Sequence, residues 1–172
     1  MKLKITQLIV LLLIGLLPAM AQLTDRKAAK EQKKIEREKE IAALVESKRF
    51  EFKASRALPT GFRQMDLTTN PNFIRFSPDS IVSEMPFFGR AYSVPYGGEG
   101  GLKFEGKPEV YTIEKGKKFY SVDAKVKSKG DYFTINLSVS FDGGATMSIS
   151  SNNRSPISYY GEISAVVKPA EK

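Results

Sequence analysis

A glycine-rich loop with aromatic and charged neighbours carries the residues of this sequence that are best suited to binding a ligand. Residues 97–101 read Gly-Gly-Glu-Gly-Gly, and they close an irregular stretch that begins at Pro86. The backbone N–H groups of such a loop can approach an anion closely because glycine has no side chain. The candidate ligand-binding residues are Arg90, Tyr92, Tyr96, Gly97, Gly98, Glu99, Gly100 and Gly101.

The same loop also has a purely structural interpretation. Its glycines would then form a tight connection, and Tyr92 and Tyr96 would cover one open end of a β-sheet. The glycines do not match a phosphate-binding loop, because no Gly-Lys-Ser/Thr follows them and the next segment has the pattern of a strand. A loop of this length inside a compact domain is typical either of function or of packing. Both interpretations stay open at the level of the sequence.

Several kinds of active site are excluded by composition. The chain contains no His and no Cys, so neither a Ser-His-Asp nor a Cys-His system can be built. Zinc sites made of His or Cys ligands are excluded for the same reason. A Ca²⁺ site made of oxygen ligands alone stays possible, but the sequence contains no acidic loop of the helix–loop–helix calcium type. We therefore predict no metal and no cofactor.

Carboxylates are the remaining route to catalysis. Arg90, Glu99 and Glu105 could form a charged pocket, and paired carboxylates can hydrolyse glycosidic bonds when they are held roughly 5–10 Å apart. That separation is not determined by the sequence, and structural salt bridging is the commoner use of such residues. We predict no catalytic residues and expect that the protein is not an enzyme.

Alternation of apolar and polar residues predicts the fold. The residues at 133, 135, 137, 139 and 141 are apolar and lie two apart, so they share one face of a strand, and a glycine turn at 142–144 follows them. About eight to ten strands at this spacing predict a mainly β protein, in which an antiparallel meander forms a small barrel or a two-layer sandwich. Besides this strand and one at 147–149, the predicted strands are 49–57, 62–69, 73–76, 81–85, 102–106, 110–114, 119–128 and, after a polar loop at 151–156, 157–167.

The first 21 residues have the pattern of a secretory signal peptide. Lys2 and Lys4 are basic, residues 8–17 are apolar, and Ala19-Met20-Ala21 fits a cleavage site. The apolar run is short for a membrane-spanning helix, which needs about 20 residues. We predict an exported protein, periplasmic or secreted after cleavage near Ala21. Its predicted parts are the signal peptide at 1–21, a charged helical arm at 22–47 and a β domain at 48–172.

The arm is rich in Ala, Lys, Glu and Arg, which favour helix. Residues 26–40 are polar almost all round, and such a helix buries little surface. Ile41, Leu44 and Val45 then form a short apolar stripe, which we predict docks on the β domain. The arm could bind a partner or set a spacing, and a solvated linker helix is the simpler interpretation.

The net charge of +8 has two interpretations, a soluble basic surface with no specific partner, which is the simpler one, and a surface that attracts an anionic partner. Residues 48–172 contain 18 basic and 13 acidic residues, so most of the excess belongs to the β domain. In an exported protein this charge indicates an anionic envelope surface or glycan rather than nucleic acid. A solvated face, or a charged edge that prevents aggregation, is the alternative. The lysines predicted to form one basic ladder are Lys115, Lys117, Lys118, Lys125, Lys127 and Lys129.

Two stretches of the chain resemble a known family. The first runs from Phe-Gly-Arg-Ala-Tyr at 88–92 through Pro-Tyr-Gly-Gly-Glu-Gly-Gly at 95–101 to Lys-Phe-Glu-Gly at 103–106. The second is Ser-Ile-Ser-Ser-Asn-Asn-Arg at 148–154 with Ile-Ser-Tyr at 157–159. Together with the signal peptide and charged helix, they resemble the domain of unknown function 4251 family. That resemblance implies an exported bacterial β protein, and it carries no activity, substrate or catalytic residue.

Three functions follow as hypotheses. The first is a non-catalytic β module that binds an envelope component, a glycan or another envelope protein through the glycine-rich loop. The second is a lipocalin-like carrier with a small apolar ligand between the sheet and that loop. The third is a hydrolase that uses carboxylates. A continuous internal cavity would favour the carrier, and a filled core with an exposed aromatic groove would favour the binding module. Two carboxylates that face each other across a cleft would favour the hydrolase.

Overall fold

The computed structural model describes residues 26–69, 72–93 and 100–166. The predicted signal peptide at 1–21 lies outside the described residues, as do Tyr96, Gly97, Gly98 and Glu99 of the glycine-rich loop. The chain divides into two compact units, Met1–Arg37 and Glu38–Lys172. A helix occupies residues 26–46, which confirms that a charged helix precedes the sheet.

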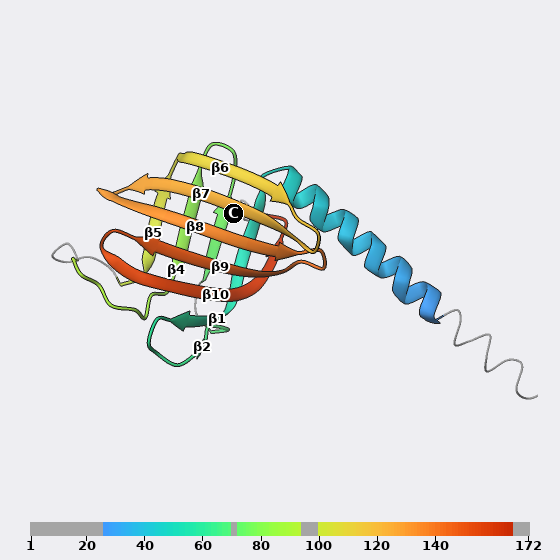
Figure 1. Ribbon diagram of the computed structural model, residues 1–172, viewed down its shortest axis with the longest axis horizontal. Coiled ribbons are helices and arrows are strands. Elements are labelled where there is room, and N and C mark those ends of the chain that lie inside the picture. Colours follow the sequence, from blue (N-terminus) through green and yellow to red (C-terminus); the bar gives the residue numbers. More distant parts are fainter. Residues whose placement is uncertain (1–25, 70–71, 94–99, 167–172) are drawn as a thin grey trace, which may run out of the picture. The chain divides into compact units, whose positions relative to one another are not determined.

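The second unit contains an antiparallel sheet whose strands follow one another around a nearly closed barrel. The order is β5-β4-β3-β1-β10-β9-β8-β7-β6, with the short β2 paired to β1. Figure 1 shows β6 to β10 crossing in front of β4 and β5. The strands are β1 (Phe50–Pro59), β2 (Met65–Asp66), β3 (Phe73–Phe76), β4 (Ile81–Met85), β5 (Leu102–Gly106), β6 (Pro108–Lys115), β7 (Phe119–Ser128), β8 (Asp131–Ser140), β9 (Gly144–Ser151) and β10 (Arg154–Ser164).

The two halves of the barrel meet in two places. Backbone hydrogen bonds join β1 to β10, and the chain itself connects β5 to β6. β1 pairs with β10 from Glu51↔Ser164 to Pro59↔Ile157, which links the first strands to the last. The two strands that end the sheet, β5 and β6, are consecutive and separated by Lys107 alone. Near this corner the Ser128 hydroxyl donates to the Glu105 carbonyl at 2.9 Å. The predicted meander is therefore confirmed, in its barrel form.

Alternation along the strands fills the interior as expected. Phe133, Ile135, Leu137 and Val139 are buried on β8, and Phe141 packs against them partly buried. The Phe104 ring of β5 stacks on the Phe133 ring with centroids 4.1 Å apart, so β5 and β8 meet through the core. Burial of this apolar surface is the main source of stability, at about 25 cal/mol per Å².

The end of the helix packs onto the same core. Ile41 and Val45 are fully buried and Leu44 is partly buried, which confirms the predicted docking stripe. Lys48, with φ of 56°, ends the turn after the helix. The Tyr111 hydroxyl donates to the Lys48 carbonyl at 3.3 Å, and the Lys48 ammonium donates to the Tyr111 carbonyl at 3.4 Å. No helix within the described residues is both long enough and apolar enough to cross a membrane.

Several predicted segments are wrong in their bounds, and for two of them the structure shows a clear physical cause. Strand 62–69 shrinks to β2, because the Asp66 carboxylate accepts hydrogen bonds from the Thr68 amide and hydroxyl and turns the chain there. These bonds favour the charged carboxylate and lower the pKa of Asp66. The polar loop at 151–156 is shorter than predicted, since β10 already begins at Arg154 and pairs with Ser151.

The predicted basic ladder is also wrong as a single surface. Lys115 pairs with Tyr120, so Lys115, Lys117 and Lys118 lie at the β6–β7 turn. Lys125 and Lys127 lie toward the other end of β7, with their ammonium groups 5.0 and 5.3 Å from the centre of the Tyr132 ring. At about 3.3 Å per residue, the two groups are roughly 20 Å apart along the strand. The lysines therefore form two separate clusters.

Candidate functional site

The first half of the candidate loop is fastened to the start of β10. Ala91 forms an isolated antiparallel bridge with Arg154. The Ser155 amide donates to the Arg90 carbonyl at 2.9 Å, and the Arg90 amide donates back to the Ser155 hydroxyl at 3.0 Å. The Tyr92 amide donates to the Asn153 carbonyl at 2.8 Å. Residues 90–92 are thus held by backbone bonds as firmly as a short strand.

Arg154 also holds the point at which the loop returns to the sheet. Its guanidinium donates to the Gly101 carbonyl and lies 5.3 Å from the centre of the Phe87 ring. Gly101 has φ of 110°, and a Cβ there would lie 2.8 Å from the Met85 carbonyl oxygen. This position therefore requires glycine. Arg154 therefore contacts the chain on both sides of residues 94–99, through Phe87 and Ala91 before them and through Gly101 after them.

The buried Tyr159 of β10 holds the start of the candidate loop at Pro86. Its side chain is fully buried in the core, and its hydroxyl donates to the Pro86 carbonyl at 2.7 Å. Burial raises the pKa of Tyr159 far above its ordinary value of 10.0, and the nearby positive charge of Arg154 opposes this only in part. The hydroxyl therefore stays protonated and keeps donating at every physiological pH.

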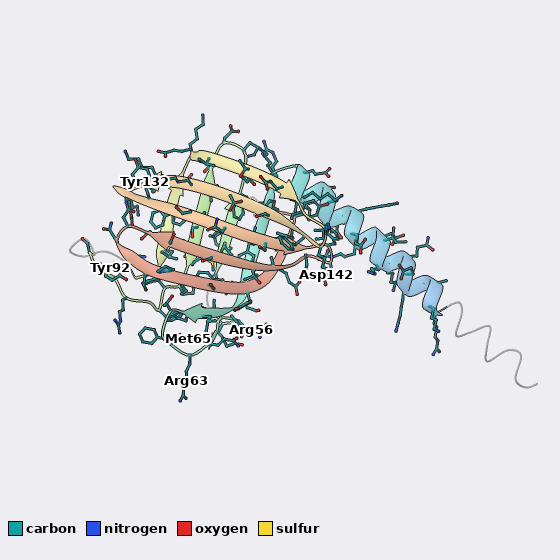
Figure 2. The ribbon with its side chains drawn as sticks, in the orientation of Figure 1. Arg56, Arg63, Met65, Tyr92, Tyr132 and Asp142 are labelled. Carbon is teal, nitrogen blue, oxygen red and sulfur yellow. The ribbon has the colours of Figure 1, made fainter. Side chains whose placement is uncertain are left out.

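The predicted site residues that the structure describes lie on or beside this anchored segment. Arg90 is exposed, and Tyr92 has 70% of its side-chain surface in solvent. Figure 2 shows Tyr92 at one end of the barrel, away from the core. A Cβ on Gly100 would have nothing within 4 Å, whereas Gly101 is buried. The structure therefore separates a buried anchor, Gly101, from an exposed surface formed by Arg90 and Tyr92.

The predicted charged pocket is not assembled by the described residues. Arg90 lies beside Ser155 at the β9–β10 turn. Glu105 lies near the opposite end of β5 from Gly101, next to Ser128 of the β7–β8 turn. Glu99 lies outside the described residues. Within the described part of the chain, no three His, Cys, Asp or Glu side chains gather closely enough to hold a metal ion.

Arg154 and Tyr159 hold the candidate loop, and the site prediction missed both of them. Both lie in the second stretch that carries the family resemblance, which was the available signal, but no role followed from it. Their partners are 53 and 73 residues away in the sequence. Only the pairing of β10 with its neighbours brings them beneath the loop.

Replacing Arg154 with Ala is expected to loosen the loop more than the barrel. The change leaves the Gly101 carbonyl without its donor and should cost about 1–3 kcal/mol of unfolding free energy. Hydrogen exchange at the amides of Arg90 and Tyr92 should accelerate. Arg56→Ala is the matched control, since Arg56 also lies over a ring, 5.7 Å from the centre of Tyr160, and is exposed. Equal exchange in the two variants would show that Arg154 is not the anchor.

The fold and the anchored segment define an antiparallel, barrel-like β protein with an exposed tyrosine, Tyr92, on a hydrogen-bonded backbone. The chain belongs to the family described as Domain of unknown function (DUF4251), whose model matches residues 32–163. It is similar to the crystal structure of a DUF4251 family protein from Bacteroides eggerthii DSM 20697, with 19% identity and a TM-score of 0.61. The similarity covers 75% of this chain and 87% of that chain. No curated protein matches the chain.

Proposed function

We propose that this protein is an exported, non-catalytic module that binds an anionic glycan of the bacterial envelope through Arg90 and Tyr92. The observation that carries the proposal is that Tyr92 combines an exposed side chain with a hydrogen-bonded backbone. The residue is 70% exposed, yet its backbone amide is hydrogen-bonded to the Asn153 carbonyl. An exposed ring on a fixed backbone loses little conformational entropy when it contacts a ligand.

The charge and position of Arg90 support an anionic ligand. Arg90 is exposed and lies two residues before Tyr92, while its backbone amide donates to the Ser155 hydroxyl. An aromatic face beside a guanidinium offers stacking to a sugar ring and a hydrogen-bonding fork to a carboxylate or phosphate. The signal-peptide pattern of residues 1–21 supports encounter with such a polymer outside the cytoplasm.

The packing of the barrel favours a surface ligand over the lipocalin-like alternative. The buried apolar residues of β1, β3 to β5 and β7 to β10 form one cluster that includes stacked rings. Two hollows lined by described residues involve outward-facing side chains of β3 and β4, such as Val82, together with buried residues, Phe104 in one and Phe76 in the other. Because the buried apolar side chains pack against one another across the barrel, we assign the binding role to the exposed loop.

The test measures binding of residues 22–172 to purified peptidoglycan sacculi by co-sedimentation. Tyr92→Ala is expected to lower the apparent affinity about tenfold, the usual effect of removing a central aromatic contact. Phe119→Ala is the control, because Phe119 is an aromatic residue with 48% of its surface exposed at the β6–β7 turn. If the wild-type protein does not sediment with sacculi, or the two variants bind equally, the proposal fails.

A further inference from the structure

One of the two hollows lies beside β3 and β4, next to Arg49 just before β1 and to residues 165 and 166 after β10. Its volume is about 500 Å³. Its apolar lining residues are Phe76, Val82 and Val166, of which Phe76 is 1% exposed and Val166 is 39% exposed. Hollows of a few hundred Å³ with apolar walls suit small organic ligands. The walls therefore fit an alkyl chain.

Polar groups gather along the same hollow. Arg49 and Arg75 line it, and the Arg75 Nε donates to the Glu51 carboxylate at 2.6 Å. Arg49 is exposed, and its side chain has no acceptor among the described residues. The two arginines and Glu51 together carry a net charge of +1. This balance suits a monoanion, such as a carboxylate, better than a dianion.

Ser80 supplies the observation that distinguishes this hollow from an ordinary apolar surface. Its side-chain oxygen is buried and has no hydrogen-bond partner within the described residues, although the residue lines the hollow. The Ser80 backbone is satisfied separately, since its amide and carbonyl both bond to Ser77. A buried hydroxyl without a partner is unfavourable. A ligand oxygen in the hollow would remove that cost.

We propose that this hollow binds a monocarboxylate with a short, unbranched alkyl chain. The carboxylate accepts hydrogen bonds from Arg49 and the Ser80 hydroxyl, and the chain lies against Phe76, Val82 and Val166. The site uses none of the residues of the Arg90–Tyr92 surface, so it stands whether or not that surface binds a glycan.

The experiment is an NMR titration of residues 22–172 with octanoate, followed through the backbone amides. Sub-millimolar, one-site binding is expected, with the largest shifts at Ser80, Val82 and Val166. Arg49→Gln and Ser80→Ala should each weaken octanoate binding, the former about tenfold, as for loss of a hydrogen bond to a charged group. Arg63→Gln is the control, since Arg63 is an exposed arginine outside the hollow, labelled in Figure 2.

Two further probes identify the head group that the hollow selects. 1-Octanol, which has the chain but no charge, should bind at least about tenfold more weakly than octanoate and should not respond to Arg49→Gln. Octyl phosphate should not bind more tightly than octanoate. Absence of octanoate binding, equal binding of octanol, tighter binding of the phosphate, or an equal effect of Arg49→Gln and Arg63→Gln would each overturn the proposal.

Discussion

Gly161→Ala is expected to unfold or severely destabilise the barrel, although it adds a single methyl group. Gly161 lies in the middle of β10, opposite Ala54 of β1 and Ala145 of β9. A Cβ built there would lie 2.0 Å from the Lys53 carbonyl oxygen and 2.8 Å from the Ala54 Cα. Both are backbone atoms, so no side-chain rotation can relieve the contact.

The position of this clash explains the size of the expected effect. The pairing of β1 with β10 is the hydrogen-bonded seam that connects β3 to β5 with β6 to β9. Its register shifts between Ala54 and Arg56, so the two backbones approach closely beside Gly161. Forcing them apart should cost about 3 kcal/mol or more of unfolding free energy.

Urea denaturation of Gly161→Ala and Gly100→Ala measures the difference. Gly100 is the matched control because a Cβ there meets nothing within 4 Å and its φ is not in the left-handed region. Its midpoint should stay close to that of the wild-type protein, whereas the midpoint of Gly161→Ala should fall sharply or vanish. Similar midpoints for both variants would mean that the β1–β10 seam adjusts easily.

Most strands could be predicted because each has one buried and one solvated face. Along β7, Tyr120, Val122, Ala124 and Val126 are buried and alternate with residues that reach solvent. The predicted bounds of β3, β4, β5 and β7 coincide with the observed ones. Period-two burial is a local property, and the sequence alone therefore reveals it.

The errors have a different physical origin. Residues 62–69 contain enough apolar positions for a strand, but Leu67 enters the core while the Asp66 and Thr68 side chains capture neighbouring polar groups. Side chains that bond to nearby backbone compete with strand pairing. The choice between barrel and sandwich depended on whether β1 meets β10, a contact between residues more than 90 positions apart. No local pattern determines it.

The sequence predicted which segment carries the candidate site, but not the residues that hold this segment in place. The exposed residues Arg90 and Tyr92 could be chosen because aromatic and charged residues stood out in a glycine-rich stretch. The groups that fix them are Arg154, Ser155 and Tyr159. The pattern there predicts a polar loop at 151–156, and nothing in it apart from the family resemblance marks these residues as partners of the candidate loop. Long-range pairing gives these residues their role.

Tyr159 should combine a large structural effect with a distinctive dependence on pH. Tyr159→Ala removes a fully buried ring and the donor to the Pro86 carbonyl, and we expect a loss of about 3–5 kcal/mol of unfolding free energy. Tyr159→Phe keeps the ring and removes the hydroxyl, so it should cost about 1 kcal/mol at neutral pH. Urea denaturation at pH 8 provides both values. Equal losses in the two variants would show that the hydroxyl, not the ring, carries the effect.

The same hydroxyl should make the wild-type protein less stable in alkaline solution. Because burial raises the pKa of folded Tyr159 above the ordinary value of 10.0, the unfolded chain loses this proton first as the pH rises. The stabilisation by the protonated hydroxyl is therefore complete below pH 10 and declines above it, by up to about 1.4 kcal/mol per pH unit. Burial also raises the pKa of Tyr111, which adds to the decline in every variant that keeps Tyr111.

Comparing Tyr159→Phe with the wild-type protein isolates the contribution of Tyr159 to this decline. Below pH 10 the variant should be the less stable protein, because it lacks the bond to the Pro86 carbonyl. Between pH 10 and 11.5 the wild-type free energy of unfolding should fall more steeply, so that the two curves converge or cross. Parallel curves over this range would mean that Tyr159 ionises as readily in the folded protein as in the unfolded chain, and the loop would then lack its buried, permanently protonated anchor.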